Sequence, residues 1–221
     1  MLSFILSTAQ AAPAQSGENP WIVHLRVATN GNGLLTSCAG SIINQSWVLT
    51  TASCIANSRF IWIRYGALNI IHPELVTEST TVRNHPTADI ALIGLNRVLD
   101  NTGKLLHVST NNRAEKDNIG PISIADAAAE MPESGRVCGW GASESGTPGE
   151  ILNCFDADLQ VQEDGTIAAV SEEGQATEFD LGAPLVSDGV QYGVLSSVSD
   201  GQAVYVNPAQ YRGWISDITG L

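Results

Sequence analysis

Basic residues are scarce in this sequence. Its 221 residues include ten Lys plus Arg against 23 Asp plus Glu, which gives a formal net charge of −13. Proteins that bind phosphate backbones or anionic membranes do so through Lys and Arg, so this balance argues against nucleic acid and against a membrane as partners. A solvated acidic surface that keeps the chain soluble is the simpler interpretation of the charge.

Long apolar runs and metal-binding motifs are also lacking. No stretch approaches the roughly 20 consecutive apolar residues that a membrane-spanning helix needs. The chain has four cysteines, and neither neighbouring pair shows C-x-x-C spacing or nearby histidines, so we expect neither a metal site nor a cofactor. Four cysteines fit an oxidising compartment and allow three disulfide pairings.

Helical periodicity is weak in most of the chain, and short strand-like runs take its place. Apolar runs bounded by Gly, Asn, Asp or Pro predict an all-β sandwich or barrel. They lie at residues 47–51, 61–65, 91–95, 193–196 and 204–206. The one helix that the pattern predicts covers residues 208–218, and the polar segment 107–118 is typical of a linker between two β units.

The beginning of the chain has the pattern of the end of a signal peptide. Residues 2–6 read LSFIL and are followed by AQA at 9–11, which has the small-residue pattern of a cleavage site. We therefore interpret residues 1–11 as a signal-peptide remnant and expect a secreted, extracellular protein.

Seven segments form an ordered series of motifs. They are PWIVHL at 20–25, CAGSII at 38–43, WVLTTASC at 47–54, DIALI at 89–93, GWG at 139–141, LNCFDA at 152–157 and FDLGAPL at 179–185. In this order they resemble the trypsin/chymotrypsin-like serine protease family over roughly residues 12–219. The resemblance implies an all-β fold of two Greek-key six-stranded β-barrels with a C-terminal helix. It places the first barrel at 12–106, the second at 119–207, and the helix and tail at 208–221.

The resemblance also bears on the cysteines. Cys38 and Cys54 have the spacing of the family disulfide that ties a strand to the loop following WVLTTA. Cys138 and Cys154 match no usual family pair, but they would be bridged if they lie on adjacent antiparallel strands of the second barrel.

The catalytic triad of the family is degenerate. Residue by residue, Ser53 stands in the place of the histidine, Asp89 in that of the aspartate and Leu181 in that of the nucleophile. Acyl transfer by this family needs a hydroxyl nucleophile and an imidazole that accepts and returns its proton, and neither is present at these positions. A Ser53–Asp89 dyad would be a weak substitute, because a carboxylate is a feeble base toward an alcohol. We therefore predict a pseudoprotease with no catalytic residues.

Other parts of the protease machinery are altered as well. Phe179 replaces the glycine whose backbone N–H helps to form the oxyanion hole in the family. Ser196, Ser197 and Val198 occupy the edge against which substrate backbone pairs.

The activation machinery of the family has no clear counterpart. The activating N-terminal amine would fall at Thr8, before the expected cleavage site. Asp180 then needs other partners, and we hypothesise that His24 and Thr36 hold it in a zymogen-like network.

The segment 44–46, Asn-Gln-Ser, is a glycosylation sequon expected in a turn between two strands. It makes Asn44 a candidate glycosylation site.

The resemblance implies a function without catalysis. We expect a secreted non-catalytic homologue, similar to those of arthropods, that acts as a binding, regulatory or decoy protein in extracellular proteolysis or immunity. Its partner would be a protein, such as a protease, an inhibitor or a component of a proteolytic cascade. Two alternatives stay open: a hydrolase with unrecognised catalytic residues, and a structural or storage protein.

Overall fold

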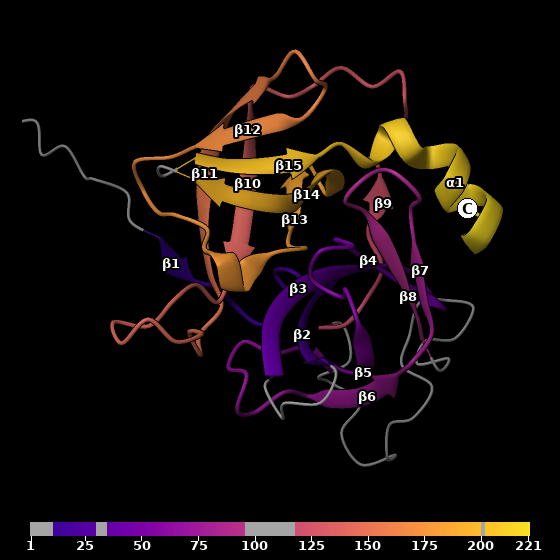
Figure 1. The fold of residues 1–221 in the computed structure, drawn as a ribbon. Coiled ribbons are helices and arrows are strands. Elements are labelled where there is room, and N and C mark those ends of the chain that lie inside the picture. Colours follow the sequence, from indigo (N-terminus) through magenta and orange to yellow (C-terminus); the bar gives the residue numbers. More distant parts are fainter. Residues whose placement is uncertain (1–10, 30–34, 96–117, 200–201) are drawn as a thin grey trace, which may run out of the picture.

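Two β-barrels lie side by side, and an α-helix follows at the C-terminal end (Figure 1). The computed structural model describes residues 11–29, 35–95, 118–199 and 202–221. The segments 1–10 and 107–117, which carry most of the predicted signal remnant and linker, lie outside the described residues. In the part of the chain that is described, no helix is long and apolar enough to cross a membrane.

The first barrel is a seven-stranded sheet that closes on itself. Its strands are β2 (Ile22–Thr29), β3 (Leu35–Asn44), β4 (Trp47–Thr50), β5 (Ser58–Tyr65), β6 (Leu75–Ser79), β7 (Val82–Asn84) and β8 (Ala91–Gly94), in the order β6-β5-β2-β3-β4-β8-β7. The end strands β6 and β7 are consecutive in the chain and separated only by Thr80 and Thr81. The Gly94 N–H donates to the Thr81 carbonyl at 2.9 Å across this bend. Counted as one bent strand, β6 and β7 complete the predicted six.

The second barrel is a closed ring of six strands with two short additions. The ring contains β10 (Ser134–Gly139), β11 (Asn153–Val161), β12 (Ile167–Val170), β13 (Pro184–Ser187), β14 (Val190–Ser199) and β15 (Gln202–Val206). In both rings the first strand is followed around the barrel by the second, third, sixth, fifth and fourth. The prediction of two six-stranded Greek-key barrels is therefore confirmed.

The two additions correct one predicted boundary. β1 (Ala12–Pro13) pairs with β11, and β9 (Ser123–Ile124) pairs with β14, so both extend the second sheet. The first barrel was predicted to start at residue 12, but residues 12 and 13 belong to the sheet of the second barrel. Motif order along the chain cannot reveal this, because the partner of β1 is about 140 residues away in sequence.

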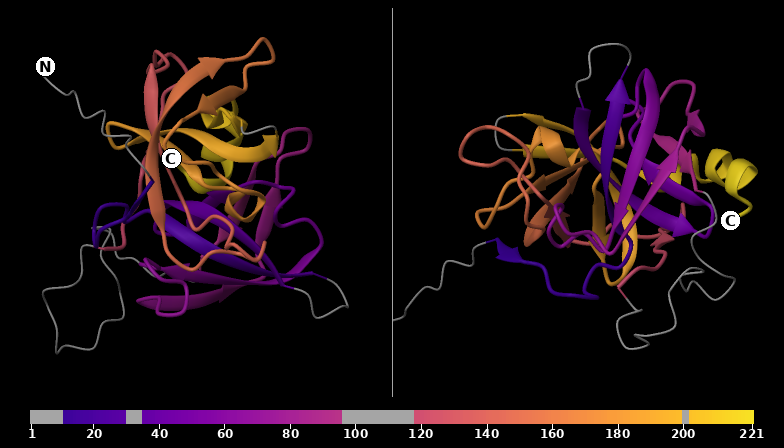
Figure 2. Two further views of the ribbon diagram at one scale, coloured as in Figure 1. Left: turned by 90° about the vertical axis from the view of Figure 1, so that its left-hand side faces the viewer. Right: turned by 90° about the horizontal axis from the view of Figure 1, so that it is seen from below.

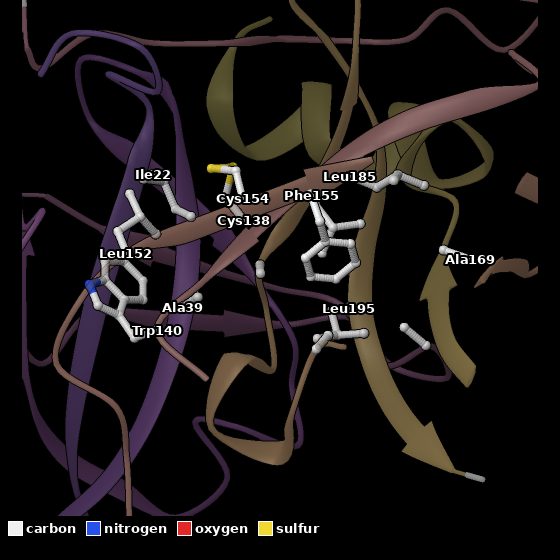
Figure 3. Packing of buried hydrophobic residues seen from close by; sticks show 14 of the residues in the cluster. Ile22, Ala39, Cys138, Trp140, Leu152, Cys154, Phe155, Ala169, Leu185 and Leu195 are labelled. Atoms are coloured by element: carbon white, nitrogen blue, oxygen red, sulfur yellow. A yellow bond between two sulfur atoms is a disulfide. The ribbon is translucent and has the colours of Figure 1, made fainter. Parts of the chain in front are cut away.

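Each barrel has its own apolar core, as the alternation of its strands requires. In β5, for example, Ile61, Ile63 and Tyr65 are fully buried, while Trp62 and Arg64 are half-buried on the outer face. Figure 3 shows the second core, in which Trp140 and Phe155 pack near the Cys138–Cys154 bridge. A third cluster, which includes Ile43, Leu49, Val194 and Ile215, joins the two barrels to the C-terminal helix.

The predicted helix at 208–218 is confirmed, although its first turn is a 3-10 turn over Pro208–Tyr211. Asn207 caps this turn by accepting the Ala209 N–H at 3.0 Å. The helix α1 (Arg212–Thr219) follows and ends at Gly220, whose φ of 76° is in the left-handed region. It lies on the opposite side of the molecule from β1 (Figure 1, Figure 2).

Candidate functional site

Ser53 and Asp89 lie together, as their predicted roles require. The pairing of Thr50 with Ala91 sets the end of β4 beside the start of β8, and so brings the turn after β4 close to Asp89, two residues before β8. The Ser53 N–H donates to Asp89 Oδ1 at 2.6 Å, and the Ser53 hydroxyl donates to Asp89 Oδ2 at 2.9 Å. Both carboxylate oxygens therefore already accept a hydrogen bond from a single residue.

This pair has little capacity for proton transfer. In a serine protease the aspartate orients an imidazole and stabilises its charged form. Here it orients an alcohol, which does not take up a proton near neutral pH. The pair is best understood as a hydrogen-bonded turn that satisfies a carboxylate.

Leu181, the residue matched in sequence to the nucleophile of the family, carries an apolar side chain at the junction of the barrels. Leu181 ends the short 3-10 turn Glu178–Asp180 and packs against the apolar clusters of both barrels. Its carbonyl accepts the Ala39 N–H at 2.8 Å. The next residue, Gly182, lies so close to Ala39 and Thr50 that a Cβ atom there would overlap both. The loop is thus bonded to β3 at Ala39 and lies close to Thr50, the last residue of β4, three residues before Ser53.

The backbone N–H of Phe179 points into its own loop. It donates to the Thr177 hydroxyl at 3.3 Å. In the resembled family the residue at this position presents its N–H to the oxyanion, so the group is here already occupied. The replacement of glycine by Phe179 predicted a changed loop. In this loop the Phe179 N–H is bonded to the Thr177 hydroxyl.

Asp180 is buried, and its carboxylate accepts hydrogen bonds both from Thr177, in a local capping box, and from the backbone of the distant turn at Trp140 and Gly141. Its Oδ2 accepts the N–H and the hydroxyl of Thr177, both at 2.9 Å, and its Oδ1 accepts the N–H groups of Trp140 and Gly141 at 2.8 and 2.9 Å. Burial raises the pKa of Asp180, and these four hydrogen bonds oppose the rise. The spacing Thr177-x-x-Asp180 is a capping-box pattern that could have been recognised in the sequence.

The hypothesis of a zymogen-like network of His24, Thr36 and Asp180 is wrong, because Asp180 makes no hydrogen bond to His24 or Thr36. His24 Nε2 is hydrogen-bonded to Ser37 Oγ at 2.7 Å, and its ring packs edge-on against Trp140 with centroids 5.0 Å apart. Thr36 is exposed, and alternation along β3 directs its side chain to the face opposite that of Ser37. Burial lowers the pKa of His24 to about 3, with smaller contributions from two nearby arginines.

A cavity of 350 Å³ lies beside Asp180 and is lined in part by Ala11, Gly139, Trp140 and Gln175. The chain approaches it through β1, and the Ala11 N–H donates to the Glu173 carbonyl at 2.8 Å. Thr8, the residue matched to the activating amine of the family, lies outside the described residues.

Ser196, Ser197 and Val198, matched in sequence to the substrate edge of the family, are part of a continuous hairpin. Ser197 and Val198 in β14 pair with Val204 and Ala203 in β15, after a register shift that follows Leu195. The Ser196 hydroxyl donates to the Val204 carbonyl at 3.1 Å. Ser197 is exposed, while Ser196 and Val198 are half-buried.

Both expected disulfides are present. Cys38 is bonded to Cys54, and Cys138 is bonded to Cys154. The second pair lies directly opposite in the register of β10 and β11, as the cross-strand interpretation required. Within the described parts of the chain, no group of three or more His, Cys, Asp or Glu side chains is arranged to hold a metal ion.

Asn44 ends β3 at the turn that leads to β4, as expected for the sequon. Its Oδ1 accepts the Ser46 N–H at 2.9 Å, and its Nδ2 donates to the Thr219 carbonyl at 3.3 Å. Attachment of a glycan to Nδ2 would require this second bond to break. Glycosylation of Asn44 stays a prediction.

The arrangement of these motifs matches a known family. The family model described as Trypsin matches residues 9–215. The chain belongs to the trypsin family. Similar relatives include human kallikrein-8, which is 28% identical over 228 residues covering 93% of this chain and 84% of the relative. Serine protease 1 of Drosophila melanogaster is 29% identical over 239 residues, covering 95% of this chain and 84% of the relative.

Solved structures agree with the trypsin-family fold. A structure of HL collagenase superposes with a TM-score of 0.77 at 24% identity and covers 96% of this chain and 99% of its own. A structure of GrC superposes with a TM-score of 0.78 at 19% identity, with the same coverage. At these identities the likeness concerns the fold alone.

Proposed function

We propose that this member of the trypsin family has no protease activity and acts by binding another protein outside the cell. The observation that carries the proposal is Leu181, an apolar side chain at the position where the family has its nucleophile. A leucine has no atom that can form an acyl intermediate.

Two further features support the loss of catalysis. Both carboxylate oxygens of Asp89 accept hydrogen bonds from Ser53, and the Phe179 N–H donates to the Thr177 hydroxyl. In the family these two positions serve different parts of acyl transfer, namely orientation of the imidazole base and oxyanion stabilisation. Reversing one of these changes would leave the other changes to the catalytic groups in place.

The retained architecture supports a binding role. Both barrels are complete, both disulfides are formed and the apolar cores are closed, so an ordered surface persists although the catalytic groups do not. Disulfides are typical of oxidising compartments, which supports secretion. The proposed role is that of a decoy or regulator in extracellular proteolysis or immunity, and the proposed partner is a protease, an inhibitor or a cascade component.

An active-site probe tests the absence of catalysis. Purified chain is incubated with a fluorophosphonate probe and with fluorogenic ester and peptide substrates, beside an active trypsin as positive control. We expect no labelling and no turnover above buffer. Labelling that is abolished by Ser53→Ala would instead favour a hydrolase with unrecognised catalytic residues.

Affinity capture tests the binding role. Immobilised chain is exposed to the native extracellular fluid, in parallel with a variant in which Ser197 and Val198 are replaced by Trp. We expect a specific protein partner, and its retention by the variant would exclude the former substrate edge as the binding surface. High abundance of the protein without any captured partner would favour a structural or storage role.

A further inference from the structure

A groove of 670 Å³ on the outer face of the first barrel has apolar walls. Leu35, Ile71 and Val76 line it and are 39%, 58% and 46% exposed. They come from β3, from the loop after β5 and from β6, which are brought together by the sheet order β6-β5-β2-β3 (Figure 1). Exposed large apolar side chains that gather in one groove mark a binding surface more often than scattered ones do.

Two arginines flank an indole on the floor of this groove. Arg26 on β2 pairs directly with Trp62 on β5, and Arg64 lies two residues further along β5 on the same face. Diagonal neighbours of this kind are roughly 7–8 Å apart, within reach of long side chains. The Trp62 indole donates to Glu78 on β6 at 3.2 Å, which fixes the ring across the floor.

The two guanidinium groups form no ion pair with any of the described residues. Arg136 and Arg212 form ion pairs with carboxylates, but Arg26 and Arg64 have neither an ion pair nor a hydrogen bond in that part of the chain. Both are half-buried. Burial lowers the pKa of Arg64, and the charge of Arg26 lowers it further. Two like charges held close in a half-buried site are unfavourable unless an anion neutralises them.

Two neighbouring arginines without ion pairs are unusual in so acidic a chain. With a net charge of −13, any two cations could easily have found carboxylate partners on the same surface. Instead, one groove combines a local positive charge with exposed apolar walls. That combination fits a ligand that presents carboxylates and an apolar side chain at short spacing.

We propose that the groove over Arg26, Trp62 and Arg64 binds an acidic, extended segment of a partner protein. Carboxylates of the segment lie against the two guanidinium groups, and an apolar side chain packs on Trp62, Ile71 and Val76. A polyanion such as a nucleic acid or a sulfated glycan is disfavoured, because two arginines cannot offset its repulsion by the rest of the chain. The inference rests on the proposed function as a protein-binding member of the family, and it names the surface and the chemistry of the partner.

Peptide binding to the full chain tests this assignment. The probe is a short fluorescein-labelled peptide in which Asp and Glu flank Phe and Leu, and the control peptide has Asn and Gln in place of the acids. Binding of the labelled peptide is followed by fluorescence anisotropy. Independently, the tryptophan emission of the wild-type protein and of Trp62→Phe is measured with the unlabelled peptide. We expect saturable binding of the acidic peptide only, with a blue shift that Trp62→Phe removes.

Matched variants place the peptide in the groove. Arg26→Gln with Arg64→Gln removes both charges, while Arg83→Gln removes one exposed charge on β7, outside the groove, where the side chain bonds only the carbonyl of its neighbour Val82. We expect the double variant to weaken binding at least about tenfold and Arg83→Gln to leave it unchanged. Thermal unfolding of each variant verifies that the barrel is intact.

Several outcomes would overturn the proposal. Equal binding of the amide peptide, or undiminished binding to the double variant, would remove the arginines from recognition. Preference for a heparin fragment would indicate a glycan site, and self-association that needs Arg64 would indicate a second copy of the chain. If an affinity-captured partner is retained by the double variant, the groove assignment fails while the proposed binding function stands.

Discussion

His24 Nε2 and Ser37 Oγ lie 2.7 Å apart, both residues are buried, and the His24 ring packs edge-on against Trp140. Nothing in the motif order identifies this contact, because Thr36, one residue earlier, has the same hydroxyl chemistry. The pair has consequences for stability in acid.

The stability of the fold should depend on pH through His24. Burial lowers the pKa of its ring from 6.5 to about 3, so in that interval the unfolded chain binds a proton that the folded chain does not. The contribution of neutral His24 to the free energy of unfolding is fully present above pH 6.5 and is lost as the pH falls toward 3. The expected slope is up to about 1.4 kcal/mol per pH unit. Urea unfolding of wild type and His24→Gln between pH 7 and 4 measures it as a difference between the two slopes. His72→Asn, at an exposed position, serves as the control for the removal of a histidine.

Restoring the triad should not restore hydrolysis. Ser53→His alone still lacks a nucleophile at residue 181, and Ser53→His with Leu181→Ser still has the Phe179 N–H bonded within its loop. We expect both variants to show no turnover of fluorogenic ester and peptide substrates above background. Any activity of the single variant would mean that the nucleophile has been misplaced, and activity of the double variant would mean that the Phe179 N–H is free to turn toward substrate.

The two disulfides should contribute similarly to stability. Both have a sequence separation of 16, so a description based on chain entropy assigns each about 3 kcal/mol. Cys38→Ala with Cys54→Ala and Cys138→Ala with Cys154→Ala form a matched pair of variants, compared by urea unfolding under non-reducing conditions. A loss confined to one pair would show that unfolded-chain entropy is not the main source of stabilisation.

Gly182 should tolerate no side chain. Its φ is +89°, and a Cβ there would overlap the Ala39 carbonyl oxygen and the Thr50 hydroxyl. Gly189 has a similar φ of +74°, but no atom lies within 4 Å of the position that a Cβ would take, so Gly189→Ala isolates the conformational cost of about 1 kcal/mol. We expect Gly182→Ala to cost at least about 2 kcal/mol more in thermal unfolding, since backbone atoms must move. Equal losses would show that the junction of the barrels can open at this point.

The capping box of Thr177 and Asp180 could be predicted from the sequence. The Thr177-x-x-Asp180 spacing predicts that the threonine and the carboxylate satisfy one another. The family pattern instead pointed to His24 and Thr36, which are far from Asp180 along the chain, and that prediction was wrong. The Trp140 and Gly141 donors could not be predicted in the same way, since they reach Asp180 across about 40 residues of chain.

Residue identities and their order along the chain were sufficient for several conclusions. They predicted the family, the two barrels, the pairing of Cys38 with Cys54 and the match of Leu181 to the nucleophile position of the family, because each depends on which side chain stands at a recognisable position. Only the tertiary structure decided that β1 joins the second sheet, that Ser37 rather than Thr36 meets His24, and that Arg26 and Arg64 share one groove. These features depend on strand register and on contacts between distant segments, and alternation along a strand reverses the face of a side chain with a shift of one residue.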